Sequence, residues 1–181
     1  IKYTVTDKAD GRGSLMYIVG LDHLSASDRG DYARYLGRII LIDNNLKIYN
    51  TGLTDEREAY HNSLFNGEYI TKNADEKPKP IKLFKMYDCY IVGGVNKMEL
   101  ILMDGKEGEP APVAAGAATD EAPQTETRYR HMLEYGQREG ENGFKIESKT
   151  FYLPNEKSGI SIYNVSQRIW NSPRPYHYDG L

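Results

Sequence analysis

The feature that most constrains the fold of this chain is a succession of short segments in which apolar and polar residues alternate. Glycine, asparagine or proline separates most of these segments. Alternation with a period of two places every second side chain on the same face, as in a half-buried strand. The pattern occurs at residues 1–5, 14–19, 38–43, 46–50, 63–71, 81–92, 98–103 and 144–153. Helical spacing is found at residues 128–138 and 160–170, and a short helix is expected in the polar segment at residues 25–36. Many short strands with few helices predict an α+β fold with mostly antiparallel sheets flanked by helices.

Turn residues support this prediction at two places. Asn44 and Asn45 separate residues 38–43 from 46–50, and asparagine tolerates positive φ, so a tight hairpin is expected there. Gly93 and Gly94 end the longest strand pattern. The sequence therefore predicts at least one β-hairpin and a sharp turn after residue 92.

Composition limits the domain organisation and the kinds of partner. A chain of 181 residues suits one domain with a sizeable core. Residues 104–127 are rich in Ala, Pro, Gly and acids, which predicts a flexible insertion. The net charge of −3 argues against a generally basic nucleic-acid-binding surface, although it allows a local basic cleft. No segment approaches the roughly 18 apolar residues of a membrane helix, so no membrane partner is expected. The single cysteine, Cys89, fits a reducing, cytosolic compartment.

Lys8 is the strongest candidate for a chemically reactive residue. It lies between Asp7 and Asp10, after a predicted strand and before Gly11 and Gly13. A lysine amine becomes a nucleophile when desolvation or nearby cations lower its pKa. The alternative for this residue alone is an exposed lysine in a turn.

Three further motifs follow Lys8 in the chain. KADG at residues 8–11 is followed by NGEY at 66–69, YDCY at 87–90 and YDGL at 178–181. In this order the four segments resemble motifs I, III, IIIa and IV of the covalent nucleotidyltransferase superfamily. That superfamily contains mRNA capping guanylyltransferases, ATP-dependent DNA ligases and RNA ligases. The segment RIILIDNNLKIYNTG also resembles the hairpin that precedes motif III in capping enzymes.

The resemblance implies a ligase- or capping-type nucleotidyltransferase fold and a lysyl-nucleotide intermediate. A capping guanylyltransferase forms lysyl-GMP from GTP and transfers GMP to the diphosphate 5′ end of RNA, with Mg²⁺ or Mn²⁺ as cofactor. Lys8 would be the nucleophile, and Glu68 would contact the ribose or help to hold the metal. Tyr87 would stack on the base, and Asp179 would be a metal-organising carboxylate.

Basic residues are also expected around the nucleotide. Arg12 and Lys149 are the main candidates for nucleotide binding. With Lys47, Lys82 and Lys85 they are expected to line a local basic cleft near Lys8.

The sequence also departs from the family pattern. Many members carry Arg two residues after the motif I glycine, where this chain has Gly13, and motif III usually begins with Asp rather than Asn66. The chain ends within motif IV, so motif V and the C-terminal OB domain are absent from it. Residues 1–181 are therefore expected to be a partial nucleotidyltransferase domain, inactive alone, whose partners include the remaining domains of a longer capping enzyme.

Three functions remain open. Asp179 in place of the Glu usual in DNA ligases, together with YDC and LIDNN, favours a capping guanylyltransferase. Capping enzymes of this kind occur in large DNA viruses, which suggests a viral protein of the cytoplasm, the virus factory or the virion. The first alternative is the adenylation domain of an ATP-dependent polynucleotide ligase. The second is a non-catalytic structural or interaction module that retains the fold.

Overall fold

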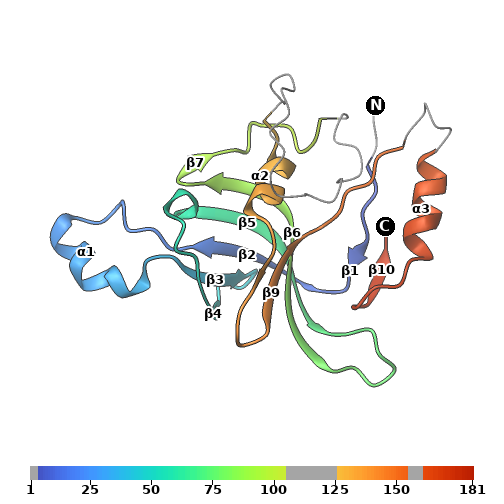
Figure 1. The fold of residues 1–181 in the computed structure, drawn as a ribbon, viewed down its shortest axis with the longest axis horizontal. Coiled ribbons are helices and arrows are strands. Elements are labelled where there is room, and N and C mark those ends of the chain that lie inside the picture. The colour runs from blue at the N-terminus through green and yellow to red at the C-terminus, as the bar shows by residue number, and fades with distance from the viewer. Residues whose placement is uncertain (1–3, 105–125, 155–160) are drawn as a thin grey trace.

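The structure is a computed structural model that describes residues 4–104, 126–154 and 161–181 (Figure 1). It confirms the α+β class and the predominance of antiparallel pairing. The predicted insertion at residues 104–127 lies almost entirely outside the described residues, as do residues 1–3 of the first predicted strand.

Two sheets are formed within the described residues. The larger sheet has the strand order β4-β3-β2-β5-β6-β9-β8, and β7 pairs with the end of β6. All of its neighbouring strands are antiparallel except β6 and β9, which are parallel. Its strands are β2 (Arg12–Ile18), β3 (Arg38–Asp43), β4 (Ile48–Thr54), β5 (Ser63–Lys72), β6 (Pro80–Val92), β7 (Val95–Asn96), β8 (Arg138–Glu139) and β9 (Phe144–Ser148). The smaller sheet pairs β1 (Lys8–Ala9) with β10 (Tyr178–Gly180).

The described helices occupy three separate positions around the large sheet (Figure 1). Helix α2 (Arg128–Tyr135) packs on one face of the sheet, mainly against β6. Helix α1 (Ala26–Tyr32) and the short 3₁₀ turn η1 (Ala33–Tyr35) project from one end of the molecule. Helix α3 (Ile162–Trp170) stands at the other end, beside β1 and β10. A second 3₁₀ turn, η2, spans Glu58–Tyr60. None of the described helices is both long and apolar enough to cross a membrane.

Strand alternation divides the large sheet into two faces with different roles. The α2 face carries the main core, in which the strands contribute Met16, Ile18, Phe65, Phe84, Met86 and Ile146 and the helix contributes Tyr129, Met132 and Tyr135. On the opposite face, β5 presents Leu64, Asn66 and Glu68, because side chains alternate along a strand. We call this second surface the Glu68 face.

The predicted hairpin between β3 and β4 is confirmed, but its turn differs in detail. The positive φ of 62° belongs to Leu46 rather than to Asn44 or Asn45. The carboxylate of Asp43 accepts hydrogen bonds from the backbone N–H groups of Asn45 and Lys47, at 2.9 and 3.0 Å. The aspartate side chain therefore shapes the turn.

One strand prediction is wrong. Residues 98–103 do not form a strand; instead the carbonyls of Ile101 and Leu102 accept from the first N–H groups of α2, at Arg128 and Tyr129. Those N–H groups have no partner inside the helix, so the segment caps α2 rather than extending the sheet. Most of the first predicted strand lies outside the described residues; of its described part, Val5 forms an isolated antiparallel bridge with Tyr152.

Candidate active site

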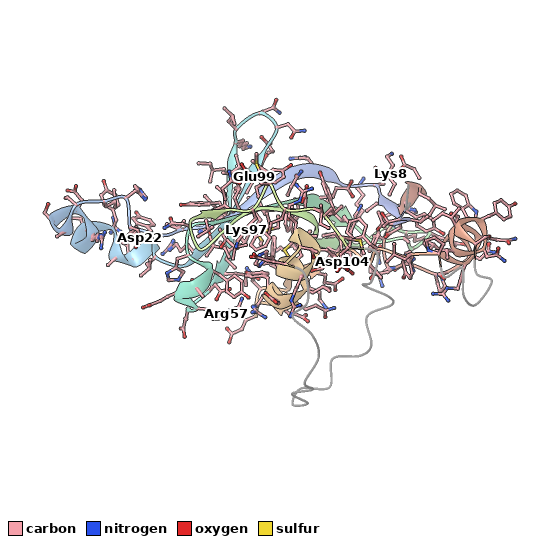
Figure 2. The ribbon with its side chains drawn as sticks, turned by 90° about the horizontal axis from the view of Figure 1, so that it is seen from above. Lys8, Asp22, Arg57, Lys97, Glu99 and Asp104 are labelled. Atoms are coloured by element: carbon pink, nitrogen blue, oxygen red, sulfur yellow. The ribbon has the colours of Figure 1, made fainter. Side chains whose placement is uncertain are left out.

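Lys8 is positioned by the short sheet that joins the two ends of the described chain. The register pairs Lys8 with Gly180 and Ala9 with Tyr178. Consequently the Lys8 amine donates a 2.7 Å hydrogen bond to Asp179, a residue 171 positions away in sequence. The Lys8 side chain is 61% exposed and that of Asp179 57% exposed, so solutes can reach both groups. In Figure 2 Lys8 lies on the side of the large sheet away from α2.

The pKa of Lys8 is shifted in the direction opposite to that of a nucleophilic lysine, whose pKa is lowered. The hydrogen bond that the Lys8 amine donates to Asp179 raises the pKa of Lys8 above its ordinary value, and the negative charges of Glu68 and Asp10 add to the effect. The same hydrogen bond lowers the pKa of Asp179. At neutral pH the pair is therefore ammonium and carboxylate, and the amine has no free lone pair for attack.

The glycine of the KADG motif brings the chain close to Glu68. A Cβ at Gly11 would lie 3.0 Å from Cβ of Glu68 and 3.1 Å from Cγ1 of Ile70. The segment between β1 and β2 therefore crosses β5 at a separation that any larger residue would oppose. This crossing places Lys8 near enough to Glu68 to feel its charge.

Buried Lys149 forms an ion pair with Glu68. Its side chain is only 4% exposed, and its Nζ lies 3.1 Å from Oε2 of Glu68. This contact is an ion pair without the geometry of a directed hydrogen bond. The same amine donates to the backbone carbonyl of Asp7 at 3.0 Å and lies 5.4 Å from the ring centroid of Tyr87. Lys149 thus contacts the residue before Lys8, the carboxylate of Glu68 and the ring of Tyr87.

Tyr87 is half-buried and fixed at its polar end. Its hydroxyl donates to Oδ1 of Asn66 at 3.1 Å, and Nδ2 of Asn66 donates to the hydroxyl of Tyr90 at 2.7 Å. Burial raises the pKa of Tyr87, and the charge of Glu68 raises it further. Asn66 therefore positions the aromatic ring of Tyr87.

Sequence reasoning missed the side chains that pair with Asp7 and with Lys85, which are Tyr176, Arg174 and Glu147. Asp7 accepts a 2.7 Å hydrogen bond from the hydroxyl of Tyr176, and Arg174 lies 3.8 Å from the same carboxylate. Lys85 forms a 3.0 Å ion pair with Glu147. The available signal was a charge within an apolar strand pattern, at Lys85 in β6 and at Glu147 in β9. Charges at such positions need partners when the strands assemble.

The predicted cleft of five basic residues is wrong. Arg12 pairs with Tyr69 across β2 and β5, whereas its neighbour Gly13 pairs with Glu68, so Arg12 points to the α2 face. There its guanidinium donates to the hydroxyl of Tyr49 at 3.2 Å. Lys47 lies 5.1 Å from the centroid of the Tyr49 ring. Lys82 donates to the carbonyl of Asn142 at 3.3 Å. Only Lys85 and Lys149 join the surroundings of Glu68.

The carboxylates near Lys8 suit a metal that is completed by substrate. Among the residues that the structure describes, no three His, Cys, Asp or Glu side chains form a ready cation site. Asp179 is exposed and Glu68 is close enough to influence Lys8, so two carboxylates face one amine. Mg²⁺ is commonly held by one or two carboxylates together with substrate phosphates. The predicted metal residues therefore fit such an arrangement.

The site as a whole combines an exposed amine, two carboxylates, a buried lysine and a half-buried aromatic ring. These groups come from β1, β5, β6, β10 and the segment after β9. No protein-family model matches this chain, and no curated protein matches it significantly.

Proposed function

We propose that this chain is the nucleotide-binding core of a covalent nucleotidyltransferase with the ligase- and capping-type fold, and that it acts as an mRNA guanylyltransferase. The observation that carries the proposal is the proximity of four side chains. The Lys8 amine is hydrogen-bonded to Asp179 and is influenced by the charge of Glu68, which also influences Tyr87. They belong to the four sequence motifs, which are far apart in the chain. In this proposal the nucleotide-binding core works with the remaining domains of a longer capping enzyme.

In the first proposed step, Nζ of Lys8 attacks the α-phosphorus of GTP. The Lys8 ammonium first releases one proton to solvent. A P–N bond then forms, the P–O bond to the β-phosphate breaks, pyrophosphate leaves and the nitrogen releases a second proton to solvent. In the second step, a terminal oxygen of the RNA 5′ diphosphate attacks the same phosphorus. A P–O bond forms, the P–N bond breaks and the Lys8 nitrogen takes up two protons from solvent, which restores the ammonium. Such transfers depend mainly on alignment and neutralisation of charge.

The neighbouring residues have distinct roles in this proposal. Tyr87 offers a ring for base stacking, which is worth about 1–3 kcal/mol. Lys149 fixes Glu68 and the backbone before Lys8. Asp179 and Glu68 would hold Mg²⁺ or Mn²⁺, which when bound neutralises their charges and so removes what raises the pKa of Lys8. Arg12 lies on the opposite face, so it has no role in this geometry.

Covalent labelling tests the proposal. The protein, together with any encoded residues after Leu181, is incubated with α-labelled GTP or ATP and Mg²⁺ or Mn²⁺. Label from GTP should appear on Lys8 and be lost in Lys8→Met. Lys145→Met is the matched control, because Lys145 is also an exposed lysine in an ion pair, 3.0 Å from Glu139. Label that survives Lys8→Met, or no label from either nucleotide, contradicts the proposal.

The same experiment addresses the two alternatives. Label from ATP alone would indicate an ATP-dependent polynucleotide ligase. The non-catalytic module is favoured by one specific observation, the raised pKa of Lys8 in its pair with Asp179. Unchanged RNA capping by a Lys8→Ala protein would support that module.

A further inference from the structure

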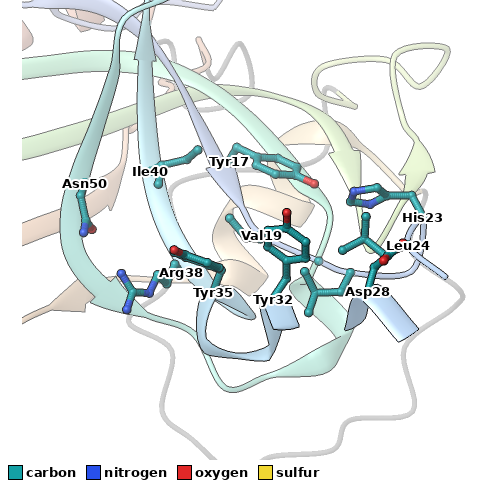
Figure 3. A pocket seen from close by; sticks show the side chains of 12 residues that line it. Tyr17, Val19, His23, Leu24, Asp28, Tyr32, Tyr35, Arg38, Ile40 and Asn50 are labelled. Carbon is teal, nitrogen blue, oxygen red and sulfur yellow. The ribbon is translucent and has the colours of Figure 1, made fainter. Parts of the chain in front are cut away.

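A pocket lies between the large sheet and the arm formed by α1 and η1, away from Lys8. It has a volume of about 840 Å³, within the range of ligand pockets. Tyr17 and Ile40 line its sheet wall, and Tyr32 and Tyr35 line the wall formed by the arm (Figure 3). Arg38 lies at its edge in the same view. The polar group of Asp28 and the ring of His23 also line it.

This pocket opens on the same face of the sheet as the candidate site. Gly13 pairs with Glu68, and Tyr17 lies four residues further along the same strand, so both residues face the side of Glu68. Tyr17 is therefore separated from Glu68 by four residues along the strand and by one strand across the sheet, which corresponds to ~15 Å. The half-buried Tyr90, linked through Asn66 to Tyr87, lies on this face as well. An elongated ligand could therefore contact both places without leaving the face.

The arm holds its aromatic rings outside any core. Tyr32 is 49% exposed and Tyr35 36% exposed, and their centroids are 6.2 Å apart. The guanidinium groups of Arg34 and Arg38 lie 4.9 and 5.2 Å from the centroid of the Tyr35 ring. Arg38 is held in place by a 3.0 Å hydrogen bond from Nε to the carbonyl of Arg34. Exposed rings beside arginines form the surface on which unpaired bases stack while phosphates are neutralised.

We propose that this pocket binds unpaired bases of the acceptor RNA, a few nucleotides from the 5′ end placed at Lys8. This inference rests on the proposed function, because that function supplies the RNA end. A stacked strand advances about 3.4 Å per nucleotide, so the ~15 Å between Glu68 and Tyr17, at the sheet wall of the pocket, corresponds to roughly four or five nucleotides. The flat walls admit any base, and the carboxylate of Asp28 can accept from base amino groups or a ribose hydroxyl.

Binding of single-stranded RNA tests the inference directly. The probe is an RNA of about ten nucleotides with a 5′ diphosphate and a 3′ fluorophore, long enough to reach the pocket. Fluorescence anisotropy of the unmodified chain is compared with that of Tyr32→Ala/Tyr35→Ala. Loss of two stacking rings should weaken binding by roughly tenfold or more. Tyr163→Ala is the matched control, since Tyr163 is a 75% exposed tyrosine on α3 at the far end of the molecule.

A second variant keeps the test independent of folding. Tyr35→Trp retains a stacking surface, so RNA affinity should be unchanged and the introduced indole should be quenched by RNA. The unmodified protein, whose single tryptophan is Trp170 on α3, supplies the baseline. Equal affinity of the double variant and the unmodified chain would overturn the inference. So would the absence of RNA binding, or equal binding of duplex RNA, whose bases are not free to stack.

The outcomes separate this inference from the proposed function. Labelling of Lys8 by GTP needs no RNA, so it should be unaffected by the changes at Tyr32 and Tyr35. Labelling with no pocket-dependent RNA binding would overturn only the pocket. Pocket-dependent RNA binding without labelling would overturn the guanylyltransferase and leave the pocket as an RNA site.

Discussion

Replacing Lys149 with methionine should destabilise the protein by about 3 kcal/mol. Methionine has nearly the same length, so packing around the buried stem is kept while the charge and both polar contacts are lost. The ion pair with Glu68 at 3.1 Å and the hydrogen bond to the carbonyl of Asp7 at 3.0 Å both disappear. The substitution therefore isolates the electrostatic role of this lysine.

The magnitude follows from what remains in the folded state. At 3.1 Å the gross attraction is about 5 kcal/mol for an effective dielectric constant of about 20. Most of that attraction offsets the desolvation of Lys149, which is 4% exposed. Removal of one partner from a buried pair costs about 3–5 kcal/mol because the other charge is left uncompensated. The Glu68 side chain is 18% exposed and recovers some hydration, which places the loss near the lower end of that range.

Urea denaturation of the unmodified protein and three variants measures this effect. The variants are Lys149→Met, Glu68→Gln and the double change, and the free energy of unfolding is compared at a common m-value. The two single changes should be non-additive, with a coupling of at least about 1 kcal/mol. A loss below about 1 kcal/mol for Lys149→Met, or a coupling within about 0.5 kcal/mol of zero, would refute the reasoning.

Three further changes test other parts of the structure. Asp179→Asn removes the negative charge that, at the acceptor of the Lys8 hydrogen bond, raises the pKa of Lys8. The amine should therefore become neutral, and react with acetic anhydride, at lower pH than in the unmodified protein; mass spectrometry measures this. Arg57→Met should lower stability by about 2 kcal/mol in urea denaturation, because Asp55 is 5% exposed and loses its 2.6 Å partner, while the 37% exposure of Arg57 limits the loss. Gly67→Ala should cost about 1–3 kcal/mol by thermal unfolding, because its Cβ would lie 2.4 Å from a backbone oxygen and 2.5 Å from an aromatic carbon of β6.

Each of these results has a clear contrary outcome. An unchanged acetylation profile at Lys8, with Lys145 as the internal reference, would show that Asp179 does not control the amine. A change below about 0.5 kcal/mol for Arg57→Met would place that ion pair among surface pairs of little weight. Unaltered stability of Gly67→Ala would mean that β5 and β6 can separate at this point without cost.

Local patterns in the sequence predicted most of the elements because they depend on neighbouring residues. Period-two alternation identified β2, β3, β5, β6 and β9, and helical spacing identified α2 and α3. The prediction failed at residues 98–103, where an apolar run caps α2 instead of pairing as a strand. Apolar residues can be buried in either way, and only the position of α2 decides between them.

The candidate site also has a part that the sequence predicted and a part that depends on the tertiary structure. By itself the sequence determined that a lysine, a glutamate, a tyrosine and an aspartate occur in four ordered motifs, since motif order is a property of the chain. Only the tertiary structure decided that Lys149 lies beneath Glu68 while Arg12 lies on the opposite face. A shift of one residue in strand register moves a side chain to the other face of a sheet, and register is set by contacts between segments distant in sequence. The pairing of β1 with β10 likewise depends on such contacts, and it alone brings Asp179 to Lys8.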